Sequence, residues 1–255
     1  MGIKKNSENE KIRKSVDEFY RKISQDEYRT EVSPEEVSAS LGYSMEMMEQ
    51  LPKGTDLGLS CGNPLENFEM ENGETLIDLG CGTGKDLFLT RIKYPDSGIL
   101  YGLDRLDEMI LKAEKIRDMK KFKDIEFRQG TLTSMPFDSE SMDKAISNCV
   151  INLEPEKQTV YNELYRILKN GGKFYISDIM LKKELPEEWK KSEKMHNTWV
   201  GGALLEEELE KIIEKAGFKN IIIIKDEVTD AYAEKWGYGL KIKEYIQRGM
   251  IMGEK

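Results

Sequence analysis

The ten residues from Thr75 to Gly84 constrain the fold of this chain more than any other stretch. They read TLIDLGCGTG, a short apolar run that leads into glycines at positions 80, 82 and 84. A segment with apolar residues at helical spacing follows at 87–92, so the pattern predicts a strand, a tight loop and a helix. Glycines permit sharp turns and close approach of a ligand, and a helix N-terminus offers unpaired N–H donors. The stretch therefore predicts a nucleotide-like ligand.

The spacing of the glycines narrows the class of ligand. A dinucleotide-binding fingerprint needs glycines at 80, 82 and 85, but residue 85 is lysine and the third glycine comes one position early. NAD is therefore disfavoured. The string DLGCGTG at 78–84 instead resembles the first motif of class I S-adenosylmethionine (SAM)-dependent methyltransferases. The alternative interpretation is that these glycines form a turn that binds no ligand.

Composition excludes several classes of function. The 255 residues suit one sizeable catalytic domain, and 39 basic against 48 acidic residues give a net charge of −9. Without a block of Lys or Arg, a nucleic-acid partner is not expected. No apolar stretch is long enough to span a membrane and the first residues lack a signal-peptide core, so we expect no membrane partner and a cytoplasmic location. Three cysteines without disulfide spacing predict free thiols in a reducing compartment.

Apolar runs alternate with helix-period segments through most of the chain. The expected strands are 75–79, 99–104, 125–128, 142–150, 173–178 and 220–225. The expected helices between the later strands are 107–120, one from Pro155 that Gly171 and Gly172 stop, and 204–216. This alternation predicts an α/β fold with a parallel, doubly wound sheet. The tail from 226 to 255 is interpreted as helical.

The first seventy residues precede this pattern. Apolar residues at 12, 16, 19, 20 and 23 predict an amphipathic helix over 8–24 that lies over the ligand site or packs on the sheet. Ser33, Pro34 and Glu36 form a capping-box signature for a second helix, and 44–50 suits a short third one. The glycine-rich stretch 52–64 has no periodicity, and an ordered loop of this kind is commonly functional. We therefore divide the chain into a helical or lid segment (1–70), a SAM-binding core (71–225) and a C-terminal extension packed on the core (226–255).

An acidic residue ends the second expected strand. Asp104 lies twenty residues beyond Gly84, where a carboxylate can accept hydrogen bonds from both ribose hydroxyls of a nucleoside. The alternative role, capping the next helix, is compatible with the first. Thr131 and Leu132 follow the third strand, where adenine would lie on a doubly wound sheet.

Five further strings resemble the arsenite methyltransferase family. They are GLSCGNP (58–64), SNCVINL (147–153), RILKNGG (166–172), ISDI (176–179) and GGAL (201–204). The resemblance runs from about residue 10 to 225. It implies a Rossmann-like class I methyltransferase sheet of seven mostly parallel strands, SAM as cofactor, and thiols that bind trivalent arsenic.

The resemblance also assigns residues. The positions that match the family's SAM site or adjoin it are Asp78, Gly80, Cys81, Gly82, Gly84, Asp104, Arg105, Met109, Thr131, Leu132 and Asn148, with Asn148 beside the methionine part of SAM. Cys61 and Cys149 match two of the family's arsenic-binding thiols. The third is missing, because Trp199 stands two residues before the Gly201-Gly202 string where family members have cysteine. The resemblance places Trp199, Gly201 and Gly202 in the substrate pocket. The N-terminal cysteine pair of many members is absent too.

Methyl transfer from a sulfonium needs a well-placed lone pair and exclusion of water. Trivalent arsenic carries such a lone pair and, being soft, prefers thiolates. Two thiols suffice if its third valence is already a methyl group or a small thiol such as glutathione. We therefore expect Cys61 and Cys149 to act on methylated or thiol-bound arsenic rather than on free arsenite.

Other interpretations remain open. Cys149 suits a buried strand end, Cys61 a loop thiol, and Cys81 a substitute ligand. Trp199 either closes the pocket by packing or offers a π face to the substrate. The rival functions are methylation of another small acceptor (a thiol, a selenium compound or an organic molecule) and a SAM-binding module that regulates a partner without turnover.

Overall fold

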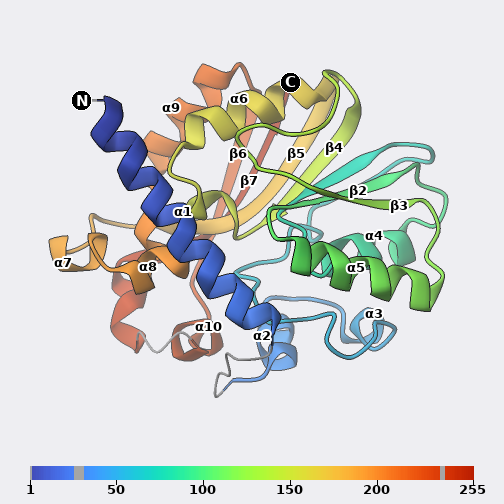
Figure 1. Ribbon diagram of the computed structural model, residues 1–255, viewed down its shortest axis with the longest axis horizontal. Coiled ribbons are helices and arrows are strands. Elements are labelled where there is room, and N and C mark those ends of the chain that lie inside the picture. Colours follow the sequence, from blue (N-terminus) through green and yellow to red (C-terminus); the bar gives the residue numbers. More distant parts are fainter. Residues whose placement is uncertain (1, 26–31, 236–238) are drawn as a thin grey trace.

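A computed structural model describes residues 2–25, 32–235 and 239–255, and Figure 1 shows its arrangement. One seven-stranded sheet has the order β3-β2-β1-β4-β5-β7-β6. The strands are β1 (Leu76–Leu79), β2 (Leu100–Asp104), β3 (Ile125–Gln129), β4 (Met142–Asn148), β5 (Leu168–Leu181), β6 (Lys219–Asp226) and β7 (Ile246–Glu254). The five strands from β3 to β5 pair in parallel, and β7 is antiparallel to both of its neighbours. The predicted mostly parallel, doubly wound sheet is confirmed.

Helices cover both faces of the sheet. The main ones are α4 (Lys85–Lys93), α5 (Asp107–Lys120), α6 (Lys157–Ile167) and α9 (Glu206–Ala216). α4 and α5 pack on one face and α6 and α9 on the other. Side chains alternate between the two faces along β1. Leu76 packs in the core on the side of α4 and α5, and Ile77 and Leu79 pack in the core on the side of α6 and α9.

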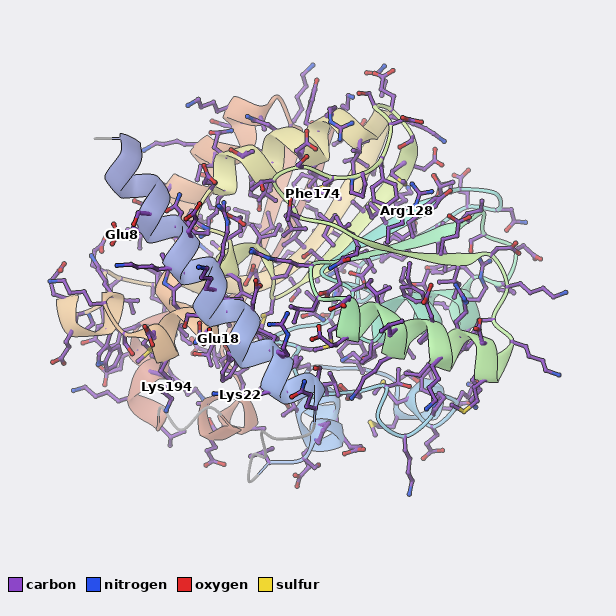
Figure 2. All side chains as sticks on the ribbon, viewed as in Figure 1. Glu8, Glu18, Lys22, Arg128, Phe174 and Lys194 are labelled. Carbon is purple, nitrogen blue, oxygen red and sulfur yellow. A yellow bond between two sulfur atoms is a disulfide. The ribbon has the colours of Figure 1, made fainter. Side chains whose placement is uncertain are left out.

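The N-terminal helix α1 (Gly2–Ser24) crosses the molecule in front of the sheet (Figure 1). It packs on α8 (Glu193–Asn197) and α5. Its outer face carries exposed charged side chains, among them Glu8, Glu18 and Lys22 (Figure 2). The predicted capping box opens α2 (Pro34–Ser40), and Ser44 caps the short α3 (Met45–Met48). No described helix combines the length and apolar character that crossing a bilayer requires.

The C-terminal tail corrects the expectation of a helical extension. After α10 (Asp230–Lys235) and a 3₁₀ helix (Leu240–Glu244), the chain forms β7 between β5 and β6. Gly249 and Gly253 interrupt the apolar pattern of this strand in the sequence. Packing against side chains of β5 explains both glycines. A Cβ at Gly249 would lie 2.3 Å from Met180 Sδ, and one at Gly253 would lie 2.6 Å from Phe174 Cε1.

Two predicted boundaries are also wrong. α6 ends at Ile167 without a glycine cap, because Leu168 already pairs with Met142 as the first residue of β5. β4 ends at Asn148, since Cys149 adopts a φ of +57° that a strand cannot continue. Short helices α7 (Glu187–Lys190) and α8, and 3₁₀ turns at Ile151–Leu153 and Val200–Gly202, complete the fold.

Candidate active site

A pocket opens at the carboxyl ends of β1, β2 and β4. β1 pairs with β2 on one side and β4 on the other, which makes this the switch point where open α/β sheets bind ligands. Most of the residues assigned from the sequence line it: Asp78, Gly80, Cys81, Gly82, Asp104, Arg105, Met109, Thr131, Leu132, Asn148, Cys149 and Trp199. Gly84, Cys61, Gly201 and Gly202 are not in the lining.

The glycine loop has the geometry that its sequence predicts. Gly80, Gly82 and Gly84 have φ of +73°, +51° and +85°, a region costly for other residues. A Cβ at Gly80 would lie 2.4 Å from Val150 Cγ2, whereas one at Gly82 would meet no protein atom within 4 Å. Gly84 is the N-cap of α4, packed against Phe88. The loop therefore leaves open space for a ligand at Gly82.

Asp104 joins two segments of the pocket wall. Its Oδ2 accepts a hydrogen bond from the Gly82 N–H at 2.9 Å, and its Oδ1 accepts one from the Leu106 N–H, also at 2.9 Å. Burial raises the pKa of this carboxyl group. Each oxygen keeps a lone pair that can accept a ligand hydroxyl, so the bond that caps the next helix does not exclude a ligand-binding role.

Cys81 and Asp78 lie deeper in the wall. Burial raises the pKa of the Cys81 thiol well above its usual value, and Asp104 and Asp78 raise it further. A protonated thiol is a poor ligand. Burial likewise raises the pKa of Asp78, with further contributions from Asp86 and Asp104. Cys81 is also not among the donor groups that lie together with Cys61 and Cys149, which argues against it as a substitute arsenic ligand.

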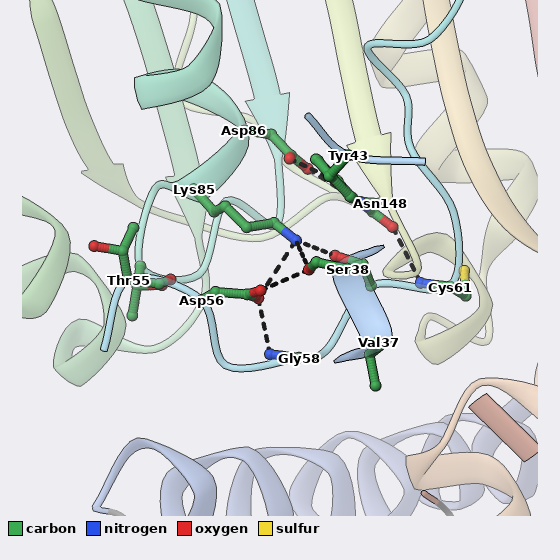
Figure 3. A network of polar contacts seen from close by, with 12 residues as sticks. Val37, Ser38, Tyr43, Thr55, Asp56, Gly58, Cys61, Lys85, Asp86 and Asn148 are labelled. Atoms are coloured by element: carbon green, nitrogen blue, oxygen red, sulfur yellow. Dashed lines mark hydrogen bonds and ion pairs between the residues drawn. The ribbon is translucent and has the colours of Figure 1, made fainter. Parts of the chain in front are cut away.

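Hydrogen bonds of Asn148, at the end of β4, hold the irregular loop 52–64 in place (Figure 3). Its Oδ1 accepts from the Cys61 N–H at 3.4 Å, and its Nδ2 donates to the Gly62 carbonyl at 3.1 Å. The same Nδ2 lies 2.8 Å from Tyr43 Oη and 3.1 Å from Asp86 Oδ2. Asn148 thus holds the segment that carries Cys61 while it lines the pocket.

Lys85 makes a second attachment to this loop. Its buried ammonium donates to Ser60 Oγ at 2.6 Å and to Ser38 Oγ at 3.3 Å, and it pairs with Asp56 Oδ1 at 3.4 Å. It also lies 4.0 Å from the centre of the Tyr43 ring. Sequence reasoning used this lysine only to exclude a dinucleotide fingerprint. Its position on the first turn of α4 joins the glycine loop to the segment that carries Cys61.

Cys61 and Cys149 meet at the end of the pocket. Their Cα atoms are 5.9 Å apart and the structure joins them as a disulfide, with Cys81 the free cysteine. The expectation of three free thiols is therefore wrong for this pair. The Cys149 N–H donates to the Ser177 carbonyl at 2.8 Å, which fixes the residue at its positive φ. The pair must be reduced before it can bind a soft acceptor.

Glycine at position 62 allows this meeting. A Cβ there would lie 1.8 Å from Ser177 Oγ, so Gly62→Ala should destabilise the fold by about 1–3 kcal/mol through overpacking. Denaturant unfolding measures the change. Adding Ser177→Ala removes the colliding oxygen and should restore most of the loss. Equal stability of Gly62→Ala and the wild type would show that the loop does not need this close approach.

Trp199 forms the wall of the pocket beside the cysteines. It is 1% exposed and adopts a φ of +68°, a conformation that persists in non-glycine residues only when the surroundings enforce it. Its ring lies 6.3 Å from that of Tyr20 and 6.2 Å from that of Tyr232. Gly202 serves packing, because a Cβ there would lie 1.9 Å from the Asn152 carbonyl oxygen, and a Cβ at Gly201 would meet His196 at 2.8 Å.

Helix α1 supplies further pocket residues, of which the sequence did not single out Arg13 and Asp17. Arg13, Val16, Asp17 and Tyr20 line the pocket. Arg13 makes ion pairs with the buried Glu154 and with Glu156. Helical periodicity predicted that α1 covers either the site or the sheet, and the ion pairs settle its position over the site.

A family model described as a methyltransferase domain matches residues 70–217, more than half of the chain. The chain belongs to the methyltransferase domain family. SAM is the cofactor of such methyltransferases, and the pocket fits it. Asp104 offers acceptors for ribose hydroxyls and Gly82 leaves room at the loop. The side chains of Leu106, Met109 and Leu132 line the same pocket, where they would form an apolar slot for adenine.

Several curated relatives to which the chain is similar are arsenite methyltransferases. The chain is 36% identical to the arsenite methyltransferase of Halobacterium salinarum over 219 residues, which covers 86% of this chain and 56% of that protein. It is also 36% identical to human arsenite methyltransferase over 152 residues, 56% of this chain and 40% of that protein. The chain thus spans about half the length of these relatives.

Solved methyltransferase structures share the fold. An arsenic (III) SAM methyltransferase from Chlamydomonas reinhardtii superimposes with a TM-score of 0.63 at 24% identity, over 86% of this chain and 72% of that one. Phosphoethanolamine N-methyltransferase 2 from Haemonchus contortus, in complex with SAM, gives 0.65 at 18% identity, over 76% and 51%. Because both identities lie below 25%, these similarities support the fold and no more specific function.

Proposed function

We propose that this methyltransferase transfers the methyl group of SAM to trivalent arsenic held by Cys61 and Cys149. The observation that carries the proposal is the meeting of these two cysteines, 5.9 Å apart at Cα, at the end of a pocket that also contains the glycine loop. The similarity to arsenite methyltransferases supports the same acceptor.

Asp104, the glycine loop and the apolar slot would hold SAM, which supplies an electrophilic methyl group. The protein's own task is to orient the acceptor and exclude water, because arsenic brings its own lone pair and needs no general base. Asn148 and Lys85 fix the Cys61 loop. Helix α1 and Trp199 close the pocket around the reacting atoms.

The acceptor that we propose is methylated or thiol-capped arsenic rather than free arsenite. Two protein thiols fill two valences of the arsenic, and Trp199 stands where the family's third thiol would be. A methyl group or a small thiol then fills the third. Glutathione is a suitable partner, because the Cys61–Cys149 pair also needs a reductant, and a thiol-rich compartment such as the cytoplasm would supply both.

The test is methyl transfer from labelled SAM, with excess glutathione, to methylarsenite and to arsenite. We expect product from both, with methylarsenite methylated about tenfold faster or more, because it needs only two thiols. A preference for arsenite would overturn the proposed acceptor. SAM binding without turnover of either arsenical would instead favour another thiol, selenium or organic acceptor, or a regulatory module.

A further inference from the structure

A buried carboxyl group lies beside the cysteine pair. Asp178, in β5, follows the Ser177 carbonyl that accepts from the Cys149 N–H. Its carboxylate oxygen and the sulfurs of Cys61 and Cys149 all lie within 4.8 Å of one another, and all three residues are buried. Asp178 belongs to the ISDI string (176–179), but neither that resemblance nor the similarity to known methyltransferases assigns it a role.

The protein holds the Asp178 carboxyl group in one orientation. Oδ1 accepts from the Ile179 N–H at 2.8 Å, and Oδ2 accepts from the Asn152 N–H at 3.2 Å. The backbone N–H of Ile151 also interacts with this carboxylate, and since a carboxylate has about four acceptor positions, capacity remains for one further ligand. Donors bound to one atom through bonds of roughly 2.0–2.3 Å, the lengths found for thiolate and carboxylate on zinc, lie closer together than 4.8 Å. Once the disulfide is reduced, the two sulfurs can move apart to the spacing of two ligands, and the Asp178 oxygen already lies within 4.8 Å of both.

We propose that Asp178 supplies the third ligand when trivalent arsenic binds as arsenite, whose third valence carries neither a methyl group nor a small thiol. The inference rests on the proposed function, because it assumes arsenic on Cys61 and Cys149. Two thiolates and one carboxylate neutralise a trivalent arsenic, and a buried site strongly favours a neutral complex. Carboxylate is a harder donor than thiolate, so the third bond is the weakest of the three.

The placement of Asp178 also orients the lone pair. Three-coordinate arsenic is pyramidal, with its lone pair opposite the three ligands. Cys149 lines the pocket whereas Cys61 and Asp178 lie outside its lining. Ligands on the buried side direct the lone pair toward the pocket, where the methyl donor would lie. Asp178 therefore serves binding and orientation together.

The binding step balances without an external oxidant. Two molecules of a thiol reductant such as glutathione first convert the Cys61–Cys149 disulfide to two thiols and leave as one disulfide. The two thiols and the Asp178 carboxylic acid then replace the three hydroxyls of arsenious acid. Three water molecules leave, and two As–S bonds and one As–O bond form. Methylarsenite has only two hydroxyls and therefore binds to the thiols without Asp178.

The experiment compares the wild type with Asp178→Asn, both reduced with a phosphine, by titration with arsenite and with methylarsenite. We expect Asp178→Asn to weaken arsenite binding about tenfold or more, equal to about 1.4 kcal/mol, and to leave methylarsenite binding within about twofold. Native mass spectrometry of the wild-type complex should show the loss of three waters with arsenite. Two waters, with a hydroxyl retained on arsenic, would overturn the inference.

A second variant covers the case in which Asp178→Asn fails to fold, as measured by SAM binding. Asp178→Cys supplies a softer donor at the same place, and X-ray absorption of its arsenite complex should show three sulfurs against two sulfurs and one oxygen in the wild type. Equal arsenite affinity in wild type and Asp178→Asn contradicts the role of Asp178 alone. Failure of the reduced wild type to bind either arsenical contradicts the proposed function itself.

Discussion

Cys149→Ser should lose methyl transfer to both arsenite and methylarsenite by about 100-fold or more, while SAM binding stays within about twofold. The serine hydroxyl is a hard, neutral donor and a far poorer ligand for trivalent arsenic than the soft thiolate that it replaces. A loss in turnover with the cofactor site intact is the signature of a residue that holds the acceptor. Transfer from labelled SAM, together with SAM binding by calorimetry, measures both quantities.

Two matched variants complete this test. Cys61→Ser should show the same loss for both arsenicals, because both thiols hold the acceptor, whereas Cys81→Ala should keep the activity within about twofold. Cys81 is buried and is not among the donor groups that lie together with Cys61 and Cys149, so we expect it to form no bond to arsenic. Methylation of methylarsenite that survives in Cys61→Ser or Cys149→Ser would contradict a two-thiol site.

Trp199→Cys should restore a third thiol and shift the acceptor preference toward arsenite. We expect arsenite methylation to rise about tenfold relative to methylarsenite, since three thiols then fill its three valences. The same change should destabilise the protein by about 3–5 kcal/mol, because a fully buried tryptophan leaves a large cavity. Activity ratios and denaturant unfolding check the two effects separately.

Trp199→Phe is the control for packing. It keeps an aromatic ring against Tyr20 and Tyr232 but adds no thiol, so it should lower stability less and leave the acceptor preference unchanged. If Trp199→Phe shifts the preference as strongly as Trp199→Cys, the shape of the pocket and not the number of thiols selects the acceptor.

The sequence predicted the parallel half of the fold because local signals agree there. The apolar runs of β1 to β5, the glycine loop and the helices between them each have a strong pattern. β7 was missed because Gly249 and Gly253 interrupt its apolar alternation. The reason for those glycines is the bulk of Met180 and Phe174 on the neighbouring strand, which no local window contains.

The same distinction between local and distant signals applies to the candidate active site. The glycine loop and Asp104 follow their strands directly, so the topology alone brings them together. The roles of Lys85 and Asp178 depend on where the loop 52–64 and helix α2 fold back, which periodicity does not specify. The strings that resemble the arsenite methyltransferase family identified Cys61 and Cys149, but spacing alone did not predict that they pair.

The position of β7 implies an order in which the strands of the sheet can pair during folding. β6 pairs within the sheet only through β7, and β7 pairs with a strand about eighty positions earlier, with Lys173 opposite Glu254. During synthesis the parallel strands can assemble first, while residues 219–226 wait without a partner. The edge of β5 also stays open until residues 246–254 arrive. This late closure exposes apolar strand edges to chaperones and to other nascent chains.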